Sequence, residues 1–207
     1  MMKINYQNMM EEELNIIKVL PEKPSLLLHT CCAPCSSYII ELLRDYFDIT
    51  LYFYNPNIYP KEEHDRRLNE LRLFVERFDS NKDIKLIAEE YTPIEFASCV
   101  TGLEEEREGG SRCFKCYDLR LSKTAVRASE ENFDYFCTTL SISPHKNAEK
   151  INEIGKELAN IYEVKFLFSN FKKKNGFKRS LELSKDFDLY RQEYCGCQYS
   201  MRDSLPE

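Results

Sequence analysis

The sequence predicts a single α/β domain, with a mainly parallel sheet and helices on both faces. Five short segments rich in apolar, β-branched and aromatic residues alternate with longer segments whose apolar residues recur at helical spacing. This alternation is typical of crossover units, in which each helix returns the chain so that successive strands run parallel. At 207 residues the chain is long enough for one sizeable core and too short for two independent ones.

The first two strands and their helices lie in the first third of the chain. Residues 25–30, SLLLHT, form an apolar run with a polar end, and a cysteine-containing loop leads into a helix over 36–47, with Ser36 as N-cap. The second strand, 49–55, is closed by the loop NPNIYP. The next helix is expected over 61–79, because one face of it carries Leu68, Leu71, Val75 and Phe78.

The alternation continues to the end of the sequence. In chain order we expect a strand over 84–91, a helix from Thr92, a charged segment GLEEEREGGS, a helix from Arg112 to Glu130 capped by Ser111, a strand over 133–139, a helix over 145–161, a strand over 164–168 and a helix over 180–190. Residues 1–22 form an N-terminal extension. Because sites in such sheets lie beyond the carboxyl ends of the strands, the loop after the first strand is the first place to look for chemistry.

The composition is that of an ordinary soluble protein. Apolar residues make up 43% and charged residues 31% of the chain, and no apolar run approaches the ~20 residues that span a bilayer, which excludes a helical membrane protein. The first twenty residues lack the basic start, apolar stretch and cleavage site of an export signal. A cytoplasmic location is therefore expected.

The charge is unevenly distributed. A net charge of −6 excludes a uniformly basic nucleic-acid binder, but residues 165–180 carry six cations and no acid. Four phenylalanines are interleaved with these cations, and such a segment is able to meet phosphates and stack bases. The alternative is a solvated surface loop with a few buried rings. Residues 165–197 contain this basic segment and the last two cysteines, and we expect them to form the C-terminal part of the site.

Cysteines give the strongest chemical signal. There are nine, an odd number that excludes complete pairing, and seven fall into three tight groups: Cys31, Cys32 and Cys35; Cys113 and Cys116; Cys195 and Cys197. In a reducing compartment, clustered cysteines indicate metal ligands or redox-active thiols rather than structural disulfides. We therefore expect metal or redox chemistry.

Two of these groups together supply a set of four thiolates. Cys113 and Cys116 lie three residues apart at the start of a predicted helix, where the helix dipole favours low thiol pKa values. Cys31 and Cys32 are neighbours in a loop. Four thiolates suit either a tetrahedral zinc ion or a [4Fe–4S] cluster. An adjacent Cys–Cys pair fits a structural zinc site poorly, so the cluster is favoured.

The third group is suited to reversible oxidation. A disulfide between Cys195 and Cys197 would close a small, strained ring, and strained disulfides are the more oxidising ones. Gly196 supplies the backbone freedom that either ring closure or joint metal ligation requires. Cys35 is left over, and two interpretations stay open for it: a ligand to a second metal, or a free thiol.

The remaining cysteines and the histidines are weaker candidates. Cys99 and Cys137 have no close partner in sequence, so structural burial is expected for both. A non-catalytic role is expected for His29, His64 and His145. The loop after the first strand, HTCCAPCS, lacks the glycines that would let backbone N–H groups bind phosphates, which argues against ATP as a cofactor.

Five ordered motifs resemble a known family. The strings LLLHTCCAPCSSY, FYNPNIYPKEEHDRR, SRCFKCYDLRLSKTA, CTTLSISPHKN and FKRSLELSKDFDLYRQEYCGCQYS are similar to those of the QueH-type epoxyqueuosine reductases, over about Ser25 to Ser200. The resemblance implies a fold akin to the adenine nucleotide alpha-hydrolase-like (HUP-like) three-layer group. It further implies that a two-electron reduction converts epoxyqueuosine in the anticodon loop of tRNA to queuosine, the last step of queuosine synthesis.

The resemblance also implies roles for particular residues. The cofactors that it implies are a [4Fe–4S] cluster and an additional iron, without cobalamin, and it implies an external electron donor. The cluster would be held by Cys31, Cys32, Cys113 and Cys116. The redox-active pair would be Cys195 and Cys197. Cys35, which stands where some members have an aspartate, becomes a candidate ligand for the additional iron.

Deoxygenation also requires a proton donor or a Lewis acid for the oxygen that leaves. The candidate donors are a thiol of the Cys195 and Cys197 pair, His29 or Tyr117. Under the resemblance, the basic segment, Arg179 and Arg191 become candidate contacts for tRNA phosphates.

Three aromatic residues are candidates for stacking on an extruded base: Tyr54, Tyr59 and Phe114. Core packing is the alternative for each of them. Two other functions stay open for the chain as a whole, an ATP-dependent tRNA sulfur-transfer enzyme and a non-enzymatic RNA-binding module stabilised by zinc.

Overall fold

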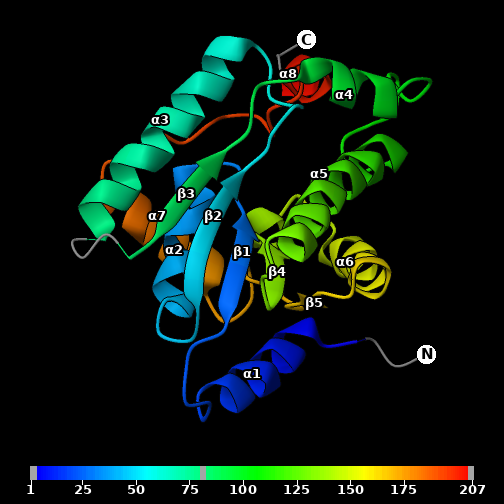
Figure 1. Ribbon diagram of the computed structural model, residues 1–207. Coiled ribbons are helices and arrows are strands. Elements are labelled where there is room, and N and C mark those ends of the chain that lie inside the picture. Colours follow the sequence, from blue (N-terminus) through cyan, green and yellow to red (C-terminus); the bar gives the residue numbers. More distant parts are fainter. Residues whose placement is uncertain (1–3, 80–82, 205–207) are drawn as a thin grey trace.

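A single five-stranded parallel sheet organises the computed structural model, which describes residues 4–79 and 83–204. The strand order is β3-β2-β1-β4-β5 (Figure 1). All four pairings are parallel, as the alternation of strands and helices predicted. The strands are β1 (Ser25–His29), β2 (Asp48–Phe53), β3 (Lys85–Ala88), β4 (Tyr135–Thr138) and β5 (Lys165–Phe166).

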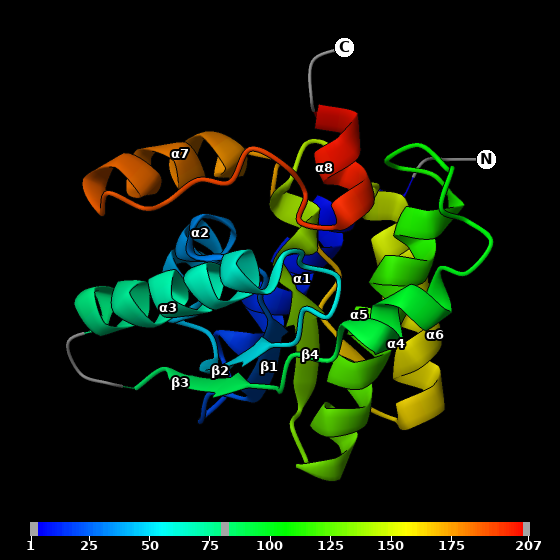
Figure 2. The ribbon, with the colours of Figure 1, turned by 90° about the horizontal axis from the view of Figure 1, so that it is seen from above.

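Helices cover both faces of the sheet (Figure 2). One face packs against α1 (Tyr6–Ile17), α2 (Ala33–Leu43) and α3 (Lys61–Phe78), and the other against α5 (Ser111–Glu130) and α6 (Ala148–Tyr162). A further helix, α7 (Gly176–Asp186), packs on the outer side of α2. The alternation of side chains along β1 produces this division: Leu26 and Leu28 join the first core, and Leu27 joins the second. The expected three-layer arrangement is therefore confirmed.

Shorter elements gather where the strands end. These are α4 (Pro93–Cys99), α8 (Gln198–Ser204) and a 3-10 turn, Thr139–Ile142, that follows β4 directly. In Figure 1, α4 and α8 lie beyond the tips of the strand arrows, beside the start of α5. Within the described residues, no helix is both long enough and apolar enough to cross a membrane.

The start of α2 differs from the expectation in a way that matters for the chemistry. The helix begins at Ala33 rather than Ser36, and its N-cap is Cys32, whose sulfur accepts a hydrogen bond from the Cys35 amide at 3.3 Å. Pro34 lies in the first turn, where a missing N–H costs nothing. Cys35 is therefore a helical residue, which turns its side chain back toward Cys32.

Other boundaries were shifted or missed. α5 is capped by Gly110 without a side-chain hydrogen bond, so the expected cap Ser111 is its first residue. α7 begins at Gly176 rather than 180. Neither α1 nor α8 was expected; α1 lies within the predicted N-terminal extension and places Met10, Leu14 and Ile17 in the core.

Candidate cysteine-rich metal and redox site

Three cysteine sulfurs meet at the junction of β1 and α2. The Sγ atoms of Cys31, Cys32 and Cys35, called the cysteine trio below, all lie within 4.8 Å of one another. The Sγ atoms of Cys31 and Cys32 are 3.8 Å apart. In the part of the chain that the structure describes, this is the only group of three metal-ligating side chains that is so close. Cys35, which the sequence left unassigned, thus stands beside the two predicted ligands.

Hydrogen bonds within the trio give its three thiols different pKa values. The pKa of Cys31 lies well below its ordinary value, because its sulfur accepts hydrogen bonds from Cys32 and Cys35. Burial and the same contact with Cys31 raise the pKa of Cys32, and the contacts with Cys31 and Cys32 raise that of Cys35. One thiolate is thus stabilised by two thiols, an arrangement ready to exchange its remaining protons for a metal ion.

The second cysteine group lies in the first turns of α5. The Cys113 sulfur accepts the Gly109 amide at 3.2 Å, and Cys116 is buried. Burial raises the pKa of both thiols, to about 12 for Cys116. The expectation that the helix dipole would lower these pKa values is therefore wrong, because desolvation outweighs the dipole.

The third group approaches the second from the C-terminal segment. Cys197 is buried with Cys116, Phe96 and Val100 in one small apolar cluster, and its sulfur accepts the Ser200 amide at 3.4 Å. After burial, proximity to Cys195 and Cys197 also contributes to the raised pKa values of Cys113 and Cys116. All nine cysteines are free thiols, including Cys99 and the buried Cys137, for which no partner was expected.

A buried arginine connects the first and second groups. Arg120 of α5 donates to the Asn55 Oδ1 at 2.6 Å and to the His29 Nε2 at 3.2 Å, and its Nη1 lies 4.0 Å from the Cys116 sulfur. An arginine guanidinium is protonated at neutral pH, and although burial opposes its charge, proximity to Cys116 and Cys31 favours it and keeps the pKa above its ordinary value. Arg120 therefore supplies positive charge between cysteines that are about 85 residues apart in the sequence.

His29 and Tyr117 are poor proton donors in this environment. Burial and the nearby Arg120 lower the pKa of His29 to about 3, so its ring is neutral. Its Nδ1 lies 2.8 Å from the Thr138 Oγ1, and its Nε2 accepts from Arg120. Burial raises the pKa of Tyr117 above its ordinary value. The neutral ring disfavours His29 as a proton donor, and a non-catalytic role stays the expectation for it.

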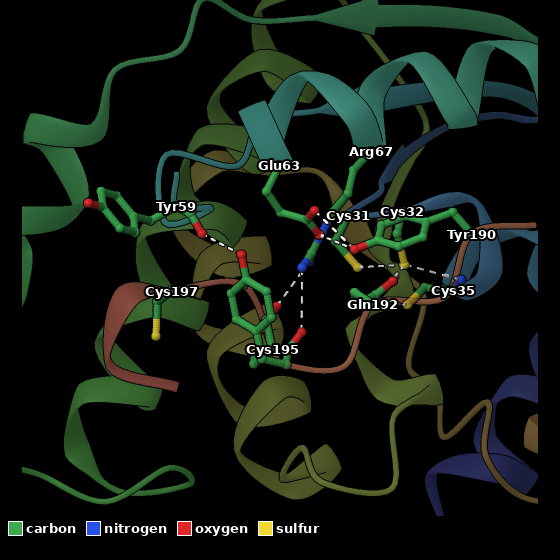
Figure 3. A network of polar contacts seen from close by, with 12 residues as sticks. Cys31, Cys32, Cys35, Tyr59, Glu63, Arg67, Tyr190, Gln192, Cys195 and Cys197 are labelled. Carbon is green, nitrogen blue, oxygen red and sulfur yellow. Dashed lines mark hydrogen bonds and ion pairs between the residues drawn. The ribbon is translucent and has the colours of Figure 1, made fainter. Parts of the chain in front are cut away.

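The Cys195–Cys197 loop is held in place by a buried ion pair (Figure 3). Arg67 of α3 is 1% exposed and pairs through Nε with the Glu63 carboxylate at 2.6 Å. Its Nη1 donates to the Cys195 carbonyl at 3.1 Å, and its Nη2 to the Tyr194 carbonyl at 3.4 Å. The loop is thus fixed to α3 through its backbone rather than through either cysteine side chain.

The same C-terminal segment touches the trio. Gln192 Nε2 lies 3.3 Å from the Cys32 sulfur and 3.9 Å from the Cys35 sulfur. An amide N–H donated to a thiolate stabilises negative charge on sulfur and tunes the potential of any iron that the sulfur binds. Residues 192–197 therefore connect the first and third cysteine groups in space.

Gly196 allows the close approach between this loop and Arg67. Its φ is +131°, and a Cβ added there would lie 3.0 Å from the Arg67 Nη1.

We expect Gly196→Ala to lower the free energy of unfolding by about 1–3 kcal/mol, because alanine is strained at this φ and displaces Arg67. Urea denaturation of the metal-free protein measures this. The matched control is Gly102→Ala, which has φ +80° and open space around it; an equal loss in both variants would show that contact with Arg67 adds nothing.

A cavity opens beside the trio and the Cys195 side chain. Its volume is about 310 Å³, and the residues that bear on its chemistry are Cys35, Lys146, Phe177, Arg191, Gln192 and Cys195. This volume is at the lower end of the range typical of small-molecule sites. Sequence reasoning missed Lys146, Gln192, Arg67 and Arg120, although all four lie within the motifs quoted above.

The basic segment is partly neutralised by acids from other elements. Lys174 pairs with Glu11 of α1, and Arg179 donates to both carboxylate oxygens of Glu41 in α2, at 2.9 and 2.7 Å. Lys173 and Lys178 are exposed, and no ion pair of theirs occurs among the described residues. Any RNA contact of this segment therefore depends more on those two lysines than on Arg179.

The three stacking candidates have different environments. Tyr54 is buried, with its hydroxyl bonded to Glu95 and its ring stacked on Tyr52, so core packing is correct for it. Phe114 is half-buried beside Tyr117. Tyr59 is 49% exposed, and it remains a candidate for stacking on a base.

Comparison with known proteins agrees with the site. The family model described as epoxyqueuosine reductase QueH matches residues 26–203. A Streptococcus pyogenes serotype M1 protein of that name is 46% identical over 202 residues, covering 97% of this chain and 79% of its own. A Staphylococcus epidermidis protein of that name is 44% identical over 202 residues, covering 96% of this chain and 85% of its own.

A solved structure confirms the fold class. The U34-tRNA thiolase NcsA from Methanococcus maripaludis with its [4Fe-4S] cluster superposes with a TM-score of 0.51 at 16% identity, over 94% of this chain and 67% of that one. A likeness at this identity speaks for the shared fold alone. The family match and the curated relatives go further, and on their basis this chain belongs to the epoxyqueuosine reductase QueH family.

Proposed function

We propose that this chain reduces epoxyqueuosine in the anticodon loop of tRNA to queuosine. The observation that carries the proposal is the family match over residues 26–203, which includes all three cysteine groups that the fold brings to one end of the sheet. The reaction consumes two electrons and two protons. Both C–O bonds of the epoxide break, a C=C bond forms, and the oxygen leaves as water.

The cysteine arrangement fits an iron–sulfur centre. Cys31, Cys32, Cys113 and Cys116 would hold a [4Fe–4S] cluster, and Cys35 would be the ligand for an additional iron. Supporting this assignment are the proximity of the trio sulfurs, the free state of all the thiols, and the positive charge of Arg120 beside them. When bound, the cluster supplies electrons one at a time, as clusters do. The family resemblance implies no cobalamin, and we assign none.

Cys195 and Cys197 would supply the two electrons that reduction of the epoxide requires. Oxidation of this dithiol to a disulfide releases two electrons and two protons, which equals what the epoxide consumes. Cys195 lines the cavity next to Cys35, and Arg67 holds the loop by its carbonyl groups. An external electron donor would then reduce the disulfide and prepare the next turnover.

The tRNA would approach over the cavity. Supporting this are the exposed Lys173, Lys178 and Arg191 on the surrounding C-terminal segment and the half-exposed ring of Tyr59. Phosphates would meet the cations, and the modified base would enter the cavity after leaving the anticodon stack.

Conversion of the modified nucleoside tests the proposal. Anaerobically purified, iron-loaded protein is mixed with tRNA that contains epoxyqueuosine and with a strong one-electron reductant, and the tRNA is then digested and its nucleosides are quantified. Queuosine is expected in proportion to the epoxyqueuosine lost. An iron-loaded preparation that leaves all of the epoxyqueuosine intact would contradict the proposed activity.

A further inference from the structure

The oxygen that leaves the substrate needs a positive partner. As each C–O bond breaks, negative charge develops on the oxygen, and a preorganised donor at that point is commonly the largest single contribution to catalysis. His29 and Tyr117 are both buried, and neither is among the residues that line the cavity. Neither of these donors expected from the sequence therefore faces a substrate held there.

Lys146 is a cation in the wall of the cavity. It lies in the loop between the 3-10 turn after β4 and α6, and it lines the cavity together with Cys35 and Cys195. Its side chain is half-buried, and its backbone is fixed, because the Lys172 Nζ donates to the Lys146 carbonyl oxygen at 2.8 Å. One hydrogen bond from the basic segment thus holds the backbone of Lys146 beside the cavity.

The ammonium group of Lys146 is charged and uncommitted. Glu108 and Glu193 also line the cavity, but no carboxylate among the described residues forms an ion pair with Lys146. A lysine ammonium group is charged at neutral pH, and Lys146 lines the same cavity as Cys35 and Cys195. A positive charge is thereby kept next to the cysteines that we assign to electron transfer.

Two other basic side chains, Arg191 and His145, line the cavity and are less suited to the task. Arg191 is exposed and donates to the Ser184 hydroxyl at 2.9 Å, which directs it toward α7. His145 is exposed at the mouth of the cavity. Either residue suits a phosphate outside the cavity better than an oxygen inside it.

We propose that Lys146 is a catalytic residue whose ammonium group donates a hydrogen bond to the epoxide oxygen of a modified base held in the cavity, and stabilises the negative charge that develops there. This inference rests on the proposed function. The atoms balance as before: two electrons reach the epoxide from the reduced protein, and the oxygen takes two protons and leaves as water. Lys146 contributes positive charge and no electrons.

Replacement of Lys146 in the full-length, iron-loaded protein tests the inference. Lys146→Met keeps an unbranched side chain of nearly the same length and removes its charge, and Lys146→Arg restores the charge. In a single turnover with pre-reduced protein, we expect Lys146→Met to slow queuosine formation by about 10²–10³-fold, the usual cost of losing one such donor, and Lys146→Arg to recover part of that loss. The matched control is Lys156→Met, which removes an exposed lysine charge of α6 away from the cavity and should leave the rate unchanged.

Two further measurements separate catalysis from structure and from binding. Two quantities should change less than about threefold in Lys146→Met. One is the iron content of the purified protein, and the other is the tRNA dissociation constant of the metal-free protein, measured over a range of salt concentrations. A weaker affinity with a flatter salt dependence and an unchanged rate would make Lys146 a phosphate contact and overturn the inference. Loss of iron would likewise overturn it, as would an unchanged single-turnover rate. If the wild-type protein itself forms no queuosine, the proposed function fails rather than the role of Lys146.

Discussion

Cys32→Ser is expected to abolish iron–sulfur incorporation while leaving the fold intact. Cys32 has two roles, since its sulfur is a proposed cluster ligand and also the N-cap of α2, accepting the Cys35 amide at 3.3 Å. Serine is a good N-cap but a poor ligand for a soft iron–sulfur centre. The variant therefore removes the ligand and preserves the cap. Iron and acid-labile sulfide per chain should fall at least about fivefold after anaerobic purification.

The controls for this variant distinguish ligation from folding. The thermal midpoint of the metal-free variant should lie within a few degrees of that of the wild type, because the cap is kept. Cys99→Ser, which changes a half-buried thiol outside the three groups, should keep its iron. A Cys32→Ser protein with the iron and sulfide content of the wild type would exclude Cys32 as a ligand.

Cys195→Ser is expected to keep its iron and lose its turnover. Cys195 is half-buried in the wall of the cavity, and the Arg67 contact is made by its carbonyl oxygen, so a serine side chain leaves the loop where it is. The variant has no dithiol to oxidise. The steady-state rate of queuosine formation should drop by at least about 10²-fold, since the proposed reaction needs a second electron that a single cluster does not store.

A second substitution tests whether both cysteines are essential to the dithiol pair. Cys197→Ser should lose turnover to the same extent, because a dithiol requires both members, and the double variant should be no worse than either single variant. Iron content is measured in parallel in all three proteins. Full activity in either single variant would end the proposed role of the pair.

Much of the fold followed from the sequence because its signals are local. The apolar run of β1, the β-branched and aromatic residues of β2 and the helical spacing of α3 each identify an element from a few neighbouring residues. The start of α2 was missed because cysteine is not among the usual capping residues. The helix α1 was missed because its amphipathic face is short, and its packing on the first core is a tertiary property.

The site was only partly predictable, for a different reason. Tight spacing identified the three cysteine groups, but spacing does not show which sulfurs meet, and Cys35 joins Cys31 and Cys32 only because α2 begins early. Buried charges were the main omission. Arg67 and Arg120 lie in helices rich in charged residues, where a solvated surface is the usual interpretation, and only the folded structure shows that both are enclosed.

The central claim is that cysteines from distant segments form one iron centre, and removal of its second half tests that claim most directly. Iron, zinc and acid-labile sulfide are measured per chain in the anaerobically purified wild type and in the Cys113→Ser, Cys116→Ser double variant. We predict about four or more iron atoms with matching sulfide in the wild type, and near-complete loss in the variant although the cysteine trio is intact. Unchanged iron in the double variant, or zinc without sulfide in the wild type, would contradict the account.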